Sequence, residues 1–256
     1  MIGKAESIAH TAVAIEYARS KKKAQEIHRN GVGEQKGEDI AKEFAQTQQL
    51  KPDCSKHTLS IILSPTVKDG HEMSLMDFRE INDDFLKRMG LDSRQSVSYL
   101  HNDAAHRHLH IYVNRIDING EPYPDSFVGA KTGKNAREIA EERGMTIGNV
   151  AKRELKEAQM LEMKEDIDVV LKSKPNSVDE LNERLLKQGI QLKEHKDREG
   201  NLRGHRFERV GESGAVFKAS KVAPNLTPNK MMFTLSRIAR GAQIENENSY
   251  QNQYSI

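Results

Sequence analysis

Alternating polar and apolar residues run along positions 106–114, and this pattern predicts a half-buried β-strand. The preceding apolar run at 97–100 predicts a neighbouring strand, with the intervening residues turning the chain back. Residues 57–63 predict a further, fully buried strand. On the strand at 106–114, the residues expected to face a core are Leu109, Ile111 and Val113. The polar residues of that strand would then share one open face of the sheet.

Helical periodicity predicts long helices over residues 6–27, 38–50, 74–89 and 148–172. Ser74 precedes the third of these helices and has Asp77 three positions later, which is the spacing of a capping box. Gly90 follows the last residue of that helix, as a C-cap does. The strands and helices together predict an α/β layer.

The last third of the chain predicts a smaller second unit. A helix is expected near 177–188, strands at 190–192 and 203–209, and a last helix near 228–240. Its basic residues are Arg203, Arg206, Lys218 and Lys221. The expected division of the chain is a core at 1–150, a long charged helix at 151–174, an accessory lobe at 175–240 and a polar, disordered tail at 241–256.

Composition narrows the class of protein. With 36% hydrophobic and 30% charged residues, the chain has the balance of an intracellular protein. Its one cysteine, Cys54, excludes an intramolecular disulfide and a cysteine-built zinc site. We find neither a signal peptide nor an apolar run long enough to span a bilayer, so a cytoplasmic location is expected. The net charge of +2 means that any nucleic-acid binding depends on local basic patches.

Four of the ten histidines fall between residues 101 and 110. His108 and His110 are two positions apart on one strand, about 6.5–7 Å between Cα atoms, so both can reach one metal ion. His106 is about 13 Å from His110 along the strand, which makes His101 the nearest source of a third ligand. Three neutral imidazoles would leave coordination positions open for an anionic oxygen, with Asp103 near enough to hydrogen-bond a metal ligand or to accept a proton. The alternative is a histidine-rich strand that binds no metal.

The pattern His101-x-Asp103-x-x-His106-x-His108-x-His110, with the apolar stretch that ends at Asn114-Arg115, resembles the third motif of conjugative relaxases. These histidine-hydrophobe-histidine endonucleases nick plasmid and mobile-element DNA at a transfer origin. The chain is similar to mobilisation proteins of integrative elements in Bacteroides-like bacteria, with which it shares the opening Met-Ile-Gly-Lys and the segments 62–65 and 113–117. The resemblance runs from residue 1 to about 150. It implies an α+β fold with an antiparallel sheet flanked by helices, and a nuclease core at 1–150.

The resemblance also implies a chemistry. Relaxases of this kind form a 5′-phosphotyrosyl intermediate and later reseal the DNA, and Tyr17 matches the position of their N-terminal tyrosine. From the residues alone, Tyr17 is an ordinary helix tyrosine. Tyr112, on the same strand face as His108 and His110, is the rival nucleophile, and His28 is the fallback because some relaxases use histidine.

Further expectations concern DNA, metal and partners. The residues expected to contact DNA are Lys22, Ser74, His106, Arg115, Lys131 and Lys134, although a helix cap at Ser74 and a solvated helix start at the last two explain them equally well. The expected cofactor is a divalent metal, manganese or magnesium, with zinc, nickel or cobalt as alternatives. The expected partners are single-stranded or locally melted DNA of the transfer origin and, by resemblance, relaxosome accessory proteins and a type IV coupling protein.

Three other classes of function remain open. One is a tyrosine-type replication initiator or single-strand transposase, whose tyrosine usually lies downstream of the histidines. A second is a three-histidine zinc hydrolase with no protein nucleophile. A third is a DNA-binding protein whose metal site is catalytically inactive or purely structural.

Overall fold

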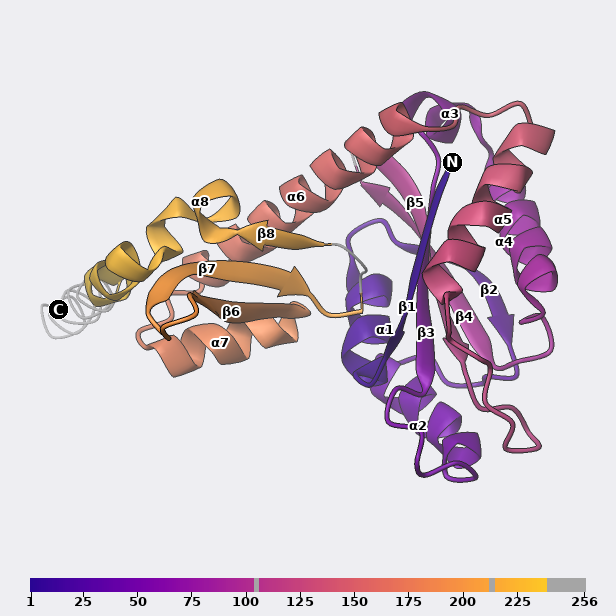
Figure 1. The fold of residues 1–256 in the computed structure, drawn as a ribbon, viewed down its shortest axis with the longest axis horizontal. Helices are drawn as coiled ribbons and strands as arrows, with labels where there is room; N and C mark the ends of the chain where they lie inside the picture. The colour runs from indigo at the N-terminus through magenta and orange to yellow at the C-terminus, as the bar shows by residue number, and fades with distance from the viewer. Residues whose placement is uncertain (104–105, 212–214, 239–256) are drawn as a thin grey trace, which may run out of the picture. The chain divides into compact units, whose positions relative to one another are not determined.

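A computed structural model describes residues 1–103, 106–211 and 215–238 (Figure 1), with the backbone alone at Asp103 and His106. The chain forms two compact units. The first contains Met1–Ala158 and a short segment that begins at Val210, and the second contains Gln159–Arg209 and the chain from Ala215 onward. The tail expected at 241–256 lies outside the described residues.

The first unit is built on a five-stranded sheet with the order β1-β3-β5-β4-β2. Every neighbouring pair of strands is antiparallel. Helices cover both faces of this sheet, so the expected α+β fold with an antiparallel sheet flanked by helices is confirmed. The strands are β1 (Ile2–Ile8), β2 (Gln25–Asn30), β3 (Thr58–Ser64), β4 (Ser96–Asp103) and β5 (His106–Asn114).

Two pairs of helices enclose the sheet. Helices α1 (Thr11–Ser20) and α2 (Gly37–Gln48) pack on one face. Helices α4 (Leu75–Met89) and α5 (Val128–Glu142) pack on the other, as Figure 1 shows with the sheet seen nearly edge-on. The short helix α3 (Val67–Glu72) follows β3, and the long helix α6 (Asn149–Lys172) runs from the first unit into the second.

Each sheet face has its own hydrophobic core. Leu109, Ile111 and Val113 lie in the core beneath α4 and α5, as their alternation predicted. The opposite face, which we expected to be open, is covered: Tyr99 and Tyr112 are packed there with apolar residues of α1 and α2. The expectation of an exposed histidine face was wrong because alternation shows which residues share a face, but not what packs on it.

The helix expected over residues 6–27 is also wrong. This stretch contains the end of β1, the ten-residue helix α1 and the start of β2. Both strands lie at the edges of the sheet, and β2 has a single buried residue, Ile27. Edge strands with polar side chains lack a clear alternation, so their pairing with β3 and β4 overrides the helical pattern.

The sequence signals for the two ends of α4 are confirmed. Ser74 accepts a hydrogen bond from the backbone N–H of Asp77, and the Asp77 carboxylate accepts one from the backbone N–H of Ser74, which completes the predicted capping box. Gly90 ends the helix with a φ of 66°, a left-handed conformation that glycine adopts without strain.

The second unit packs helices against a three-stranded sheet, β6-β7-β8. Helix α7 begins after Ser177, which caps it, and Gly189 separates α7 from β6. A buried ion pair joins Asp166 of α6 to Arg209, with 2.6 Å between Oδ2 and Nη2. The elements are α7 (Val178–Lys187), β6 (Ile190–Lys196), β7 (Leu202–Arg209), β8 (Val216–Lys218), α8 (Ala219–Val222), the 3-10 turn η1 (Pro224–Leu226) and a helical stretch at 228–238. Within the described residues, no helix has the length and apolar character that a membrane span requires.

Candidate metal centre and active site

The register of the β4–β5 hairpin gathers three histidines on one face of the sheet. His101 is directly opposite His108, and His110 is opposite Tyr99. The potential ligand atoms of the three imidazoles all lie within 4.8 Å of one another. Each ring is at most 2% exposed. The structure thus brings together the three residues that the sequence proposed as metal ligands.

Hydrogen bonds orient these rings. Nε2 of His101 is 2.8 Å from the Ala18 carbonyl oxygen of α1. A carbonyl only accepts, so this contact assigns the proton to Nε2 and the lone pair to Nδ1 in the neutral ring. Ligating histidines commonly donate their second ring N–H to a carbonyl in this way. Helix α1 therefore orients one of the candidate ligands.

The donor set fits a divalent ion. His108 and His110 approach with 3.0 Å between their Nε2 atoms. Two nitrogens bound to one ion by bonds of about 2.0–2.1 Å are separated by about 2.9 Å at a right angle and by about 3.4 Å at a tetrahedral angle. The observed spacing lies between these values. Three buried imidazole nitrogens are a chemically suitable site for a first-row transition ion.

Tyr17 extends from α1 toward this cluster. Its ring lies edge-on to His101 and His110, with centroids 5.9 Å and 6.1 Å away. The tyrosine is 5% exposed, and Nζ of Lys21 lies 5.0 Å from its ring centroid. The structure therefore places the sequence-predicted nucleophile against two of the three candidate ligands.

The two rival nucleophiles differ in their distance from the cluster. Tyr112 is stacked on His110 at 6.4 Å, beneath the helices that cover this face, and is 1% exposed. The ring of His28 contacts Asp83 of α4 at 3.0 Å and Ser96 of β4 at 3.1 Å.

Tyr99, which pairs with His110 across the two strands, is a third tyrosine beside the cluster. Burial raises the pKa of its phenol to about 12. Tyr99 therefore stays neutral at physiological pH and does not compete with the candidate nucleophile as a phenolate.

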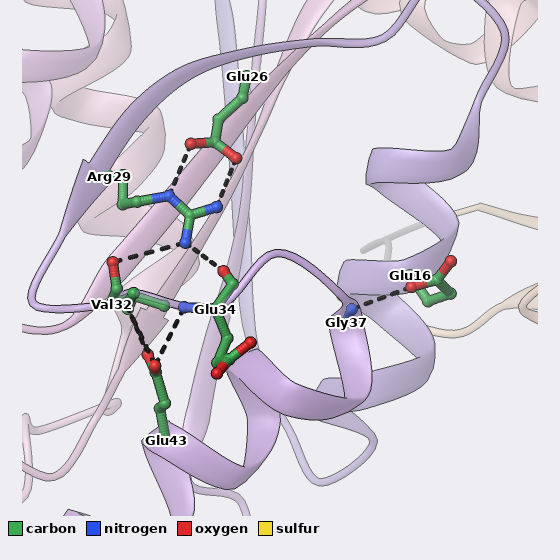
Figure 2. A network of polar contacts seen from close by, with 8 residues as sticks. Glu16, Glu26, Arg29, Val32, Glu34, Gly37 and Glu43 are labelled. Atoms are coloured by element: carbon green, nitrogen blue, oxygen red, sulfur yellow. Dashed lines mark hydrogen bonds and ion pairs between the residues drawn. The ribbon is translucent and has the colours of Figure 1, made fainter.

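A close contact between α1 and α2 positions Tyr17. The carboxylate of the adjacent Glu16 accepts a hydrogen bond of 2.9 Å from the backbone N–H of Gly37, at the start of α2 (Figure 2). Negative charge is favourable at a helix N-terminus. A Cβ added at Gly37 would lie 2.6 Å from the Glu16 nitrogen, so only glycine permits this approach. Sequence reasoning missed this contact, although the glycine at a helix start was a visible signal.

The loop that leads into α2 is held by the other contacts in Figure 2. Arg29 donates to both oxygens of Glu26, at 2.7 Å and 2.6 Å, and also to the carbonyls of Val32 and Glu34. Glu43 accepts from the backbone N–H groups of Gly33 and Glu34. These contacts fix the loop at both ends and so help to hold α2 against α1.

A basic turn borders the site. Lys22 is exposed there between Lys21, which lies over the Tyr17 ring, and Lys23, whose carbonyl accepts from Asn102 at 3.3 Å. Arg107 donates to the same Asn102 at 2.8 Å. The turn thus adjoins both Tyr17 and the end of β4 that carries His101. Sequence reasoning passed over Asn102 and Arg107.

The other residues expected to contact DNA are dispersed. Lys131 and Lys134 belong to α5, on the face of the sheet opposite the histidines. Ser74 uses its hydroxyl in the cap of α4. The side chains of Asp103 and His106 lie outside the described residues.

Arg115 has a structural role. It is 7% exposed, and its guanidinium donates to the carbonyls of Tyr123 and Lys56 and contacts Asp125 at 3.1 Å. All of its nitrogens therefore have protein partners, and we do not include Arg115 in the proposed DNA surface.

Comparison with known proteins identifies the family. A family model described as Relaxase, MobA/VirD2-like, nuclease domain matches residues 15–145, slightly more than half of the chain. The chain therefore belongs to the MobA/VirD2-like relaxases, whose nuclease domain nicks DNA for mobilisation. The match includes Tyr17 and all three histidines of the cluster. Neither the search of curated proteins nor that of solved structures gave a match.

Proposed function

We propose that the first unit nicks one DNA strand at a transfer origin, with Tyr17 as the covalent nucleophile. The edge-on contact of Tyr17 with His101 and His110 is the observation that carries this proposal. A nucleophile must lie beside the group that binds the scissile phosphate, and the Tyr17 ring contacts the rings of both His101 and His110, whereas the Tyr112 ring stacks on His110.

The reaction is a transesterification. Oη of Tyr17 forms a bond to phosphorus as the bond from phosphorus to the 3′ oxygen breaks, which leaves a 5′-phosphotyrosyl link and a 3′-hydroxyl. The phenol loses its proton, and the departing 3′ oxygen gains one. One phosphodiester replaces another, so the reverse reaction reseals the DNA without an external energy source.

We propose that His101, His108 and His110 hold a divalent metal. When bound, the metal polarises a non-bridging phosphate oxygen and offsets the charge that develops in the transition state. Three imidazole donors favour a first-row transition ion over magnesium, and among these ions zinc, nickel and cobalt bind nitrogen donors more tightly than manganese. Asp103 follows His101 by two residues in the sequence, and on this sequence pattern we propose it as the acceptor of the Tyr17 proton.

The DNA strand is proposed to enter beside the turn of Lys21, Lys22 and Lys23. Tyr17 and the histidines are almost fully buried, whereas Lys22 and Lys23 are exposed. Lys21 links this turn to the Tyr17 ring. The site requires an unpaired strand, because a phosphate within a duplex cannot approach residues buried under α1. Relaxosome proteins and a type IV coupling protein are the proposed partners on the basis of family resemblance.

The test is a cleavage assay on single-stranded oligonucleotides that span the element's transfer origin. The full chain is compared with Tyr17→Phe, Tyr112→Phe and the control Tyr123→Phe, each with manganese and with chelator. A metal-dependent covalent adduct that is lost only in Tyr17→Phe supports the proposal.

Other outcomes contradict it. Loss of the adduct only in Tyr112→Phe would move the nucleophile and favour an initiator or transposase. Metal-dependent cleavage without an adduct in any of the proteins would favour the three-histidine hydrolase.

A further inference from the structure

Positive charge is concentrated in one part of the second unit. Residues 190–209 and 215–238 contain ten Lys or Arg and four Asp or Glu, and 215–238 contains no acidic residue. By contrast, residues 159–189 of the same unit contain five basic and seven acidic residues. This asymmetry indicates an anionic ligand for the sheet and the segments that follow it.

Three cationic side chains form a row across the sheet. Lys193 of β6 is directly opposite Arg206 of β7, and Arg206 is directly opposite Lys218 of β8. Adjacent strands are about 4.8 Å apart, and like charges directly opposite each other destabilise a sheet. Lys193 is paired with Glu208. For Arg206 and Lys218, no ion pair with a carboxylate occurs among the described residues.

The row borders a cavity of about 380 Å³. Arg206 and Lys218 line it, together with the polar residues Ser220, Thr227 and Asn229, and its lining includes no Asp or Glu. His205 also lines the cavity and is 4% exposed, with Nδ1 donating to the Leu226 carbonyl at 2.8 Å.

The lining also includes Pro228 and Asn229, the start of the helical stretch 228–238. The N-terminus of a helix carries partial positive charge and favours an anion. Cations, hydroxyl and amide donors and a helix start therefore converge on one space, in a lining without carboxylates.

We propose that this cavity binds a backbone phosphate of nucleic acid and gives the protein a second DNA contact, outside the nicking centre. The phosphate would offset the repulsion between Arg206 and Lys218 and accept hydrogen bonds from the surrounding donors. This inference goes beyond the proposed function, because it does not depend on which residue is the nucleophile or on a metal.

The test measures DNA binding by the full chain through fluorescence anisotropy over a range of salt concentrations. The probes are a labelled 20-base-pair duplex that lacks the transfer-origin sequence and its single strand. The double variant Arg206→Gln/Lys218→Gln is compared with Lys164→Gln/Lys187→Gln, which removes two exposed charges from helices of the same unit. Thermal melting checks that both variants are folded.

We expect the slope of log affinity against log salt to fall by about 1–2 for the Arg206/Lys218 variant and to stay at the wild-type value for the control. The probe, duplex or single strand, whose affinity falls more in the Arg206/Lys218 variant identifies the form of DNA that supplies the phosphate. An unchanged slope, or an equal change in the control, would overturn the inference.

Adduct formation on a short oligonucleotide separates this inference from the proposed function. The Arg206/Lys218 variant should retain it, because both residues lie outside the histidine cluster. If the two variants show the expected salt slopes but the wild-type chain forms no adduct, the nicking proposal is refuted and the phosphate site is still supported.

Discussion

A metal bound by the three buried histidines should stabilise the first unit measurably. The perturbation is removal of metal with a chelator, followed by addition of manganese or zinc at about 100 times its Kd. Binding to the folded state alone adds about 2.7 kcal/mol to the free energy of unfolding under that condition. For a unit of this size, each kcal/mol raises Tm by about 2–4 °C, so the expected shift is about 5–11 °C.

The variant His108→Gln tests whether the cluster is responsible. It removes one of three donors whose ligand atoms lie within 4.8 Å of one another. Even the loss of a residue that hydrogen-bonds to a metal ligand weakens metal affinity by about 10- to 100-fold, so the loss of a ligand itself should weaken it by about 100-fold or more. At the same metal concentration, the stabilisation then falls to about 0.4 kcal/mol or less, a shift of about 1–2 °C at most.

The assay is differential scanning calorimetry of the full chain, which can resolve separate transitions of the two units. His205→Gln is the matched control, because His205 is buried and hydrogen-bonded but lies outside the cluster. A wild-type Tm that is independent of metal would refute the assignment, and so would a full shift in His108→Gln.

Three further predictions concern stability, measured by denaturant unfolding. Ser74→Ala should cost about 1 kcal/mol at neutral pH. The Ser74 hydrogen bonds lower the pKa of Asp77, so the stability that depends on the charged Asp77 is present above the unfolded pKa of 3.8 and is lost as the pH falls through the lower folded pKa. The difference between variant and wild type should therefore shrink at low pH, but the hydrogen bond from the Asp77 backbone N–H to Ser74 keeps part of it. Gly3→Ala should lower the free energy of unfolding by about 1–3 kcal/mol, because the added Cβ would lie 2.6 Å from a side-chain carbon of α5. Gly133→Ala is the control: its added Cβ would have its nearest neighbour at 3.7 Å, so this substitution should be neutral or stabilise by up to about 1 kcal/mol. Equal effects of the two substitutions would contradict the described packing. Arg209→Met should cost about 3–5 kcal/mol by leaving a buried carboxylate without its cation, and a loss below 1 kcal/mol would refute a buried ion pair.

The histidine cluster could be anticipated from sequence because its geometry is local. Strand alternation places His108 and His110 on one face, and a turn within a few residues returns His101 to the same place. Likewise, the cap at Ser74 depends only on a residue three positions away.

Features that depend on distant packing could not be read in the same way. Nothing near Tyr17 in the sequence indicates that it meets the histidines; family resemblance supplied that expectation. Nor does the sequence of α5 show which side of the sheet it covers, so the placement of Lys131 and Lys134 away from the cluster was not foreseen. The buried role of Arg115 depends on carbonyls that lie up to 59 residues away in the chain.

The hairpin origin of the cluster has a consequence for the order of folding. All three histidines lie within residues 101–110, whereas Tyr17 precedes His101 by 84 positions. A short hairpin closes in microseconds, while the entropy lost in closing a loop grows with its length. The histidines can therefore meet before α1 has packed on the sheet. In a chain that has folded only to that stage, the candidate metal ligands are together but the candidate nucleophile is not beside them. DNA cleavage would therefore require the completely folded first unit.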